Sequence, residues 1–154
     1  MPLKELVLGC DFTAVKLMKE VRNLLEQQAV PYTLIGVEDE SDETAYPLIA
    51  RQVAEAIITS GYQKEGILIC GTGIGMSISA NKFPGIYAAI CHDGYSAERA
   101  RLSNSANVIC MGARVIGPEH AKKVLGAWLN TEFQGGRSQA KLDIIRSIEE
   151  KLFR

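Results

Sequence analysis

The chain has 154 residues, 47% of them hydrophobic, and these values are typical of one globular domain with an apolar core. Its 17 Lys and Arg residues nearly balance its 18 Asp and Glu residues, so the net charge is −1. This balance disfavours a nucleic-acid-binding protein, which needs a concentrated positive face, and no apolar run reaches the ~20 residues that span a bilayer.

Short apolar runs alternate with helical patterns along the whole chain. The apolar runs predict strands over 6–10, 32–37, 67–70, 86–91 and 107–111. The helical spacings predict helices over 14–28, 46–59, 76–82, 95–103, 118–129 and 138–152. This alternation predicts an α/β fold with a parallel sheet covered on both faces. Ligands of such folds bind at the carboxyl ends of the strands.

One predicted strand ends in a glycine-rich loop that is suited to hold an anion. The run Ile67-Leu68-Ile69-Cys70 is followed by Gly71-Thr72-Gly73-Ile74-Gly75 and then by a helical pattern. Such a strand–loop–helix junction directs backbone N–H groups toward one point. The Cys70 thiol lies beside that point, which suits proton abstraction or nucleophilic attack. The loop is GxGxG rather than GxGxxG and follows the third strand, so nicotinamide binding is disfavoured.

The four cysteines each close an apolar run, and no two of them form a CxxC pair. This spacing disfavours a zinc site, and no metal is expected. Cys10, Cys91 and Cys110 are expected to be buried thiols at strand ends in a reducing compartment. Residues 1–5 lack the form of a signal peptide, so we expect a cytoplasmic protein.

Several polar residues near the predicted element ends have a structural and a functional interpretation. Asp11 follows the first strand, where it can cap the next helix. Arg137 and Lys141 share one face near the start of the last helix, and that face is either solvated or a phosphate site. His92 follows another strand and alone carries little information, and His120 is expected to be exposed.

Together these motifs resemble the ribose-5-phosphate isomerase B family, which includes the galactose-6-phosphate isomerase subunits. The resemblance extends from Leu6 to about Glu149, and its motifs occur in the family's order: Gly9-Cys10-Asp11, Tyr46-Pro47, residues 66–77, Ala80-Asn81-Lys82, Tyr95-Ser96-Ala97, Asn107-Val108, Gly112-Ala113-Arg114 and Gly135-Gly136-Arg137. It implies one isomerase domain over 1–154, a Rossmann-like three-layer sandwich with a central five-stranded parallel sheet. It also implies a homodimer or a dimer of dimers with shared active sites, in which the C-terminal helix packs on a partner subunit.

The resemblance implies aldose–ketose isomerisation of a small-molecule sugar phosphate through an enediolate, with no cofactor. The balanced charge and the short apolar runs lead us to expect no nucleic-acid or membrane partner. Cys70 would move the proton between C1 and C2, and Thr72 would assist proton transfer at the oxygens. The developing oxyanion would be held by backbone N–H groups of the loop, those of Gly71, Gly73, Ile74 and Gly75. The implied substrate-binding residues are Asp11, Phe12, Tyr46, Ser103 and Asn104, and the implied phosphate-binding residues are Arg114, Arg137 and Lys141.

The chain departs from the family pattern at two positions. Phe12 and Ser103 stand where the family usually has histidines, and the second of these is credited with opening the sugar ring. Serine has no pKa near neutrality and is a poor substitute for that proton transfer. We therefore expect an open-chain tetrose or tetrulose 4-phosphate as substrate, because the oxygen that would close a furanose ring carries the phosphate. Alternatively, His92 could take over ring opening.

Other functions remain open from the sequence. Ribose-5-phosphate/ribulose-5-phosphate and hexose-6-phosphate isomerisation are the alternatives within the family. Loss of both histidines would also suit a non-catalytic sugar-phosphate-binding subunit, although binding alone does not need the Cys70 thiol. A low-pKa thiolate at Cys70 would also suit redox sensing.

Overall fold

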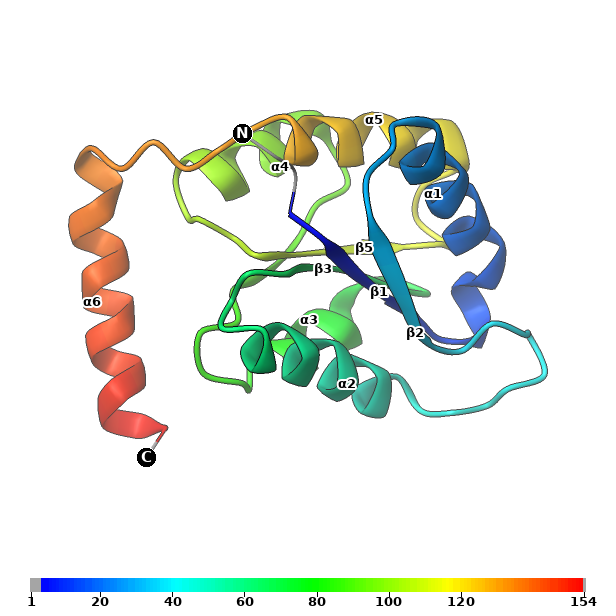
Figure 1. The fold of residues 1–154 in the computed structure, drawn as a ribbon, viewed down its shortest axis with the longest axis horizontal. Coiled ribbons are helices and arrows are strands. Elements are labelled where there is room, and N and C mark those ends of the chain that lie inside the picture. The colour runs from blue at the N-terminus through cyan, green and yellow to red at the C-terminus, as the bar shows by residue number, and fades with distance from the viewer. Residues whose placement is uncertain (1–3, 154) are drawn as a thin grey trace.

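A computed structural model describes residues 4–153 and contains one five-stranded sheet in the order β2-β1-β3-β5-β4 (Figure 1). All four strand pairings are parallel, which confirms the predicted α/β fold. The carboxyl ends of the five strands therefore lie at one edge of the sheet. The strands are β1 (Leu6–Cys10), β2 (Tyr32–Gly36), β3 (Glu65–Cys70), β4 (Ala88–Ile90) and β5 (Val108–Gly112).

Helices cover both faces of the sheet, as the sequence predicts. One face carries α1, α4 and α5, and the opposite face carries α2 and α3 (Figure 1). The sixth helix, α6, lies apart from both layers, at the side where the strands begin. The helices are η1 (Phe12–Ala14, a 3-10 turn), α1 (Val15–Gln27), α2 (Tyr46–Thr59), α3 (Ile74–Ala80), α4 (Gly94–Leu102), α5 (Pro118–Leu129) and α6 (Arg137–Leu152).

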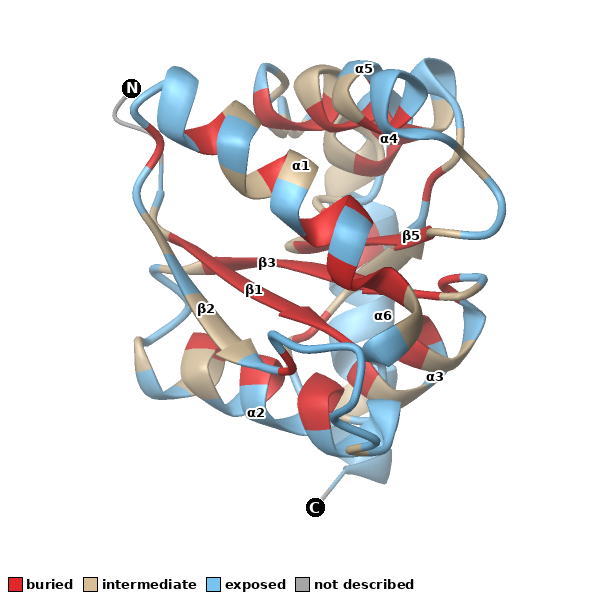
Figure 2. Cartoon of the chain, turned by 90° about the vertical axis from the view of Figure 1, so that its right-hand side faces the viewer, coloured by how far each residue is buried: buried red, intermediate tan, exposed pale blue. Residues whose placement is uncertain are grey.

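The core lies around the three central strands. Every residue of β1, β3 and β5 is buried, whereas the edge strands β2 and β4 are partly exposed (Figure 2). Continuous apolar runs therefore mark the strands that are covered on both faces. Each fully buried Leu or Ile in this core contributes about 1.5–3 kcal/mol by its removal from water. Because β3 is the central strand of the sheet, Cys70 at its carboxyl end is held in a rigid position.

A buried ionic cluster supports the opposite end of β3. The Arg101 guanidinium of α4 pairs with Glu65, the first residue of β3, and stacks 3.6 Å from the ring centroid of Trp128. Arg101 also donates to the carbonyl oxygens of Ala106 and Trp128, at 3.0 Å and 3.1 Å. The second partner of Glu65 is Lys4, at 3.7 Å. This cluster joins the helix layer to the start of the central strand.

Every predicted boundary lies within two residues of the observed one, and β1, α2 and α5 have the predicted bounds. The differences at β4 and β5 change how these strands are described. The strand predicted over 86–91 is only three residues long, and β5 continues to Gly112, so Cys110 lies inside its strand rather than at its end. All four cysteines are free and buried, as expected for Cys10, Cys91 and Cys110. The predicted domain over 1–154 includes residues 1–3 and 154, which lie outside the described residues.

Within residues 4–153, no helix combines the length and the apolar character that crossing a bilayer requires. The same residues contain no group of three or more His, Cys, Asp or Glu side chains that could hold a metal ion.

Candidate active site

Cys70 is the last residue of β3, and the glycine loop folds around its sulfur. The Gly73 N–H donates to the Cys70 Sγ at 3.2 Å. A backbone donor aimed at sulfur stabilises negative charge there. The Ile74 N–H donates to the Thr72 Oγ1 at 3.2 Å, which leaves the Thr72 hydroxyl hydrogen to donate elsewhere. Two of the N–H groups predicted to hold an oxyanion therefore donate within the loop, to a thiol and a hydroxyl.

The loop conformation depends on two glycines and on the end of β5. Gly73 has φ +82°, the left-handed region in which glycine is favoured, and from there the chain enters α3. A Cβ on Gly112 would lie 2.6 Å from the Thr72 Cα, so only glycine allows β5 to approach the loop this closely. The Ala113 N–H donates to the Cys70 carbonyl at 2.8 Å, and the Arg114 N–H donates to the Gly71 carbonyl at 3.0 Å. The loop thus rests on the residues that end β5.

Asp11 lies at the carboxyl end of the neighbouring strand, β1. The residue is only 7% exposed, and its carboxylate caps η1, accepting hydrogen bonds from the Thr13 N–H and the Thr13 hydroxyl. The predicted cap is therefore confirmed. Both bonds use the Oδ1 atom, and Oδ2 has no partner among residues 4–153. This geometry leaves one carboxylate oxygen for a ligand.

Further side chains surround the loop. Thr13 and Arg114 lie beside Gly71, with the Thr13 Oγ1 and the Arg114 Nη1 3.7 Å and 3.8 Å from the site of a Cβ on that glycine. The Tyr46 ring, at the start of α2, packs against Gly75. The structure therefore brings one set of predicted residues to a single edge of the sheet: Asp11, Phe12, Tyr46, Cys70, the loop 71–75 and Arg114.

The other three cysteines have environments that keep their thiols neutral. Burial raises the pKa of Cys10 to about 12 and that of Cys91 to about 11, and it also raises the pKa of Cys110. The nearby Asp11 and Asp93 carboxylates add to these shifts at Cys10 and Cys91, respectively. Neutral thiols are poor bases and poor nucleophiles, so these three cysteines suit a core role.

Four predicted site residues lie elsewhere in the chain. Ser103 and Asn104 follow the carboxyl end of α4, and the Ser103 Oγ accepts a hydrogen bond from the Arg99 guanidinium. Arg137 and Lys141 are exposed in the first turns of α6, as predicted for residues on one face. Because α4 runs back from the end of β4, and α6 lies where the strands begin, these four residues and the Cys70 loop belong to opposite edges (Figure 1).

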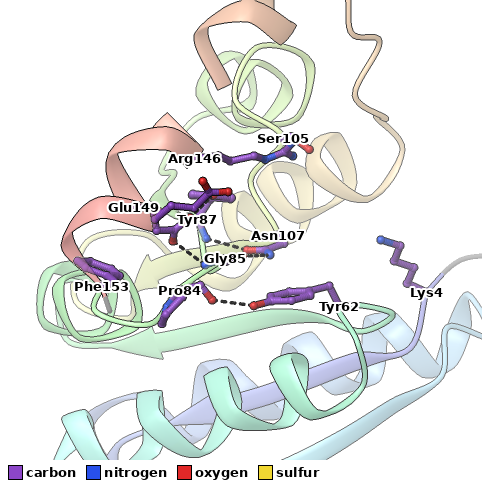
Figure 3. Close-up of a pocket in the computed structure, with 11 residues that line it drawn as sticks. Lys4, Tyr62, Pro84, Gly85, Tyr87, Ser105, Asn107, Arg146, Glu149 and Phe153 are labelled. Carbon is purple, nitrogen blue, oxygen red and sulfur yellow. Dashed lines mark hydrogen bonds between the residues drawn. The ribbon is translucent and has the colours of Figure 1, made fainter. Parts of the chain in front are cut away.

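Contacts of α6 with the rest of the chain define its position. Glu149 accepts hydrogen bonds from the Gly85 N–H at 2.6 Å and from the Tyr87 hydroxyl at 2.7 Å (Figure 3). Burial and the bond to Glu149 raise the pKa of Tyr87 to about 12. A cavity of about 660 Å³ lies beside this contact, and none of the predicted site residues lines it.

Two residues at the site were missed or undervalued by the sequence interpretation. Thr13 binds Asp11 and lies beside Gly71, and its signal was its position two residues after an Asp at a strand end. The His92 Nε2 accepts a hydrogen bond from the Gly112 N–H at 2.8 Å. His92 also follows a strand end, but the sequence does not indicate which group it contacts. His120 is exposed, as expected.

Comparison with known proteins identifies the family. Residues 6–145 match the family described as Ribose/Galactose Isomerase. The chain belongs to this family. It is therefore a sugar-phosphate isomerase, and the non-catalytic alternative is no longer needed.

The matches to individual relatives extend over nearly the whole length of this isomerase. It is 46% identical over 147 residues to "Ribose-5-P isomerase B" of Listeria innocua, covering 96% of this chain and 98% of that protein. It is 47% identical over 146 residues to "D-erythrulose-4-phosphate isomerase" of Pectobacterium atrosepticum, covering 95% of both chains. A solved structure of ribose-5-phosphate isomerase B from Mycoplasma genitalium with bound ribulose-5-phosphate has a TM-score of 0.91 and 30% identity, covering 96% of this chain and 97% of that one. Identity at this level does not choose between the two named substrates.

Proposed function

We propose that this isomerase interconverts an aldose phosphate and a ketose phosphate through an enediolate, with Cys70 as the base. The observation that carries the proposal is the Cys70 Sγ, which receives the Gly73 N–H at 3.2 Å at the end of a buried strand. A thiolate at this place removes the proton from the carbon beside the carbonyl and returns it to the neighbouring carbon. Negative charge passes from sulfur to the substrate oxygen and back, so no net charge enters the site during the reaction.

The groups around the sulfur fit the remaining steps. The Thr72 hydroxyl hydrogen is available to a substrate oxygen, because its Oγ1 already accepts the Ile74 N–H. Loop N–H groups other than those of Gly73 and Ile74, which already donate within the loop, stabilise the enediolate oxygen more than the ground-state carbonyl, and such selective stabilisation lowers the barrier. The free Oδ2 of Asp11 is suited to accept a substrate hydroxyl, and Arg114 adds positive charge beside Gly71.

We further propose that the preferred substrate is a tetrose or tetrulose 4-phosphate. The Ser103 Oγ accepts the Arg99 guanidinium, and a serine has no titration near neutrality to drive ring opening. A 4-phosphorylated four-carbon sugar has no free hydroxyl with which to close a furanose. Phe12, 44% exposed beside Asp11, gives the rim of the site an apolar face in place of a polar one. One relative named above acts on D-erythrulose 4-phosphate, which supports this choice.

The site is proposed to be completed by a second copy of the chain. The six residues of β3 span roughly 20 Å, more than the length of a sugar phosphate, so one ligand cannot contact both edges of one chain. Exposed apolar side chains are available to bury in such a dimer: Ile74 and Ile78 on α3, and Ile144, Ile145, Ile148 and Leu152 on α6. A two-fold axis would bring Arg137 and Lys141 of one protomer to the Cys70 loop of the other.

Substrate preference and the base are tested separately. The first experiment measures kcat/KM for D-erythrulose 4-phosphate, D-ribose 5-phosphate and hexose 6-phosphates. We expect the tetrulose phosphate to be preferred at least tenfold, and a tenfold preference for ribose 5-phosphate would refute that choice. The second measures deuterium exchange into bound substrate in Cys70→Ala, with Cys110→Ala as the matched control. Loss of exchange with retained binding is expected only for Cys70→Ala, by about 10²–10⁴-fold.

Assembly is tested by subunit complementation. Cys70→Ala and Lys141→Ala are each expected to be strongly impaired, while a mixed dimer contains one site with neither change. Random exchange of equal amounts should restore about a quarter of wild-type activity, since half of the dimers are mixed and each has one intact site of two. Mixed dimers detected by native mass spectrometry without restored activity would contradict the shared site.

A further inference from the structure

His92 makes a contact that the proposed chemistry does not use. It follows the short edge strand β4, whose last ladder pair is Ile90 with Cys110. One residue further on, the Cys91 N–H still donates to the Cys110 carbonyl, at 3.0 Å. The half-buried His92 side chain then takes the place of a backbone acceptor, and its Nε2 receives the Gly112 N–H at 2.8 Å. His92 thus extends the contact between β4 and β5 by one hydrogen bond.

The residue held by His92 is the one against which the catalytic loop packs. Gly112 has no free space on its loop side, since a Cβ there would lie 2.7 Å from the Thr72 carbonyl carbon and 2.8 Å from the Gly71 oxygen. The next residue, Ala113, donates to the carbonyl of Cys70 itself. A shift of Gly112 would therefore move the backbone from Cys70 to Thr72, next to the catalytic sulfur.

The contact fixes the protonation state of the imidazole. A ring nitrogen that accepts an N–H carries no proton, so Nδ1 carries the hydrogen of the neutral ring. Burial lowers the pKa of His92, and the positive charge of His120 on α5 lowers it further, while the Asp93 carboxylate before α4 opposes both. Protonation of Nε2 would place two N–H donors against each other and break the bond to Gly112.

We propose that neutral His92 is a positioning residue, which holds Gly112 and through it the Cys70 loop in the conformation needed for proton transfer. Its effect on turnover rests on the proposed function, but the bond itself does not. This role differs from ring opening, in which His92 would touch the substrate.

The test compares three variants of the whole protein. In His92→Ala the acceptor is lost, and we expect kcat to fall about 10–100-fold, because small displacements of catalytic groups have effects of this size. In His92→Gln the amide Oε1 can replace Nε2 as the acceptor without titrating, so kcat near pH 8 should stay within about threefold of wild type. His120→Gln is the matched histidine control and should keep wild-type kcat near pH 8.

The pH profile separates positioning from a merely structural role. Wild-type kcat should fall as His92 becomes protonated, below its ordinary pKa of about 6.5. The His92→Gln variant should lack this loss. Removing His120 removes a charge that disfavours protonation of His92, so His120→Gln should move the loss to higher pH. An unchanged acid limb in His92→Gln would overturn the proposal.

Three further measurements distinguish positioning from ring opening. Positioning predicts equal fold losses in His92→Ala on D-ribose 5-phosphate and D-erythrulose 4-phosphate, whereas ring opening predicts a loss on the ribose phosphate alone. Nitrogen-15 shifts should show an unprotonated Nε2 in wild type, and the Gly112 amide should exchange faster in His92→Ala. The nitrogen-15 shifts and the amide exchange need no substrate, so they test the bond to Gly112 even if neither sugar phosphate is turned over. A protonated Nε2 at pH 8 would refute the proposal.

Discussion

The Gly112→Ala substitution should disturb the Cys70 loop without removing any functional group. The added Cβ would lie 2.6 Å and 2.7 Å from the Thr72 Cα and carbonyl carbon and 2.8 Å from the Gly71 oxygen, whereas Cβ contacts below 3.0 Å essentially never occur. All three atoms are backbone, so no side chain can rotate away. The loop and the end of β5 must therefore separate by several tenths of an ångström.

The size of the effect follows from this overlap. Inserting a methyl group into a packed site costs about 1–3 kcal/mol, and a fall in Tm of about 2–4 °C accompanies each kcal/mol for a chain of this length. Displacement of the sulfur and its N–H donor should lower kcat by up to about 100-fold, with a smaller change in KM. Urea unfolding and steady-state kinetics on the same preparation measure both effects.

A second glycine provides the matched control for this experiment. Gly126 lies inside α5, and a Cβ there would meet nothing within 4 Å. Gly126→Ala should therefore raise stability by about 0.5–1 kcal/mol, because alanine is the better helix former, and should leave kcat unchanged. Wild-type stability and kcat in Gly112→Ala would show that the loop does not depend on this close packing.

Three more substitutions test other parts of the structure. Ser103→His introduces a group that titrates near neutrality and should raise kcat/KM on D-ribose 5-phosphate at least tenfold relative to D-erythrulose 4-phosphate; an unchanged ratio would contradict the role given to this position. Arg101→Met leaves Glu65 buried with Lys4 as its one remaining partner among residues 4–153 and should cost about 3 kcal/mol in urea unfolding, most of it recovered when Glu65→Met is added. Glu149→Ala removes two hydrogen bonds to α6 and should cost about 1–3 kcal/mol and speed amide exchange in that helix, and unchanged exchange would count against this anchor.

Local patterns were sufficient to predict the α/β fold class. The uninterrupted apolar runs at β1 and β3 identify strands covered on both faces, and proline at the start of α5 marks its first turn. The errors occur where tertiary contacts decide. At the sheet edge β4 pairs for only three residues, and Gly73 starts α3 two residues earlier than the apolar pattern suggests.

The candidate site was predictable where it follows chain order. Cys70 ends one strand, its loop and Asp11 each follow a strand, and parallel strands bring their carboxyl ends to one edge. Which side chains contact one another depends on strand order, which a single sequence does not specify. The bond between His92 and Gly112 requires β4 to pair with β5, although the two strands are separated by α4 in the chain. Only the fold reveals that pairing.

The attachment of α6 also determines how stability is distributed over the molecule. Leu142 is the only residue of this helix buried within residues 4–153, whereas every residue of β3 is buried. Local opening requires less free energy where little apolar surface is covered, so α6 should unfold independently in an isolated protomer while the sheet stays intact. The sulfur that would do the chemistry thus belongs to the most protected part of the chain, and the cations at 137 and 141 belong to the least protected part. A ligand that binds both the sulfur and these cations should order α6, and the free energy of that ordering lowers its affinity. The ligand should protect the amides of β3 from exchange no more than it stabilises the whole fold.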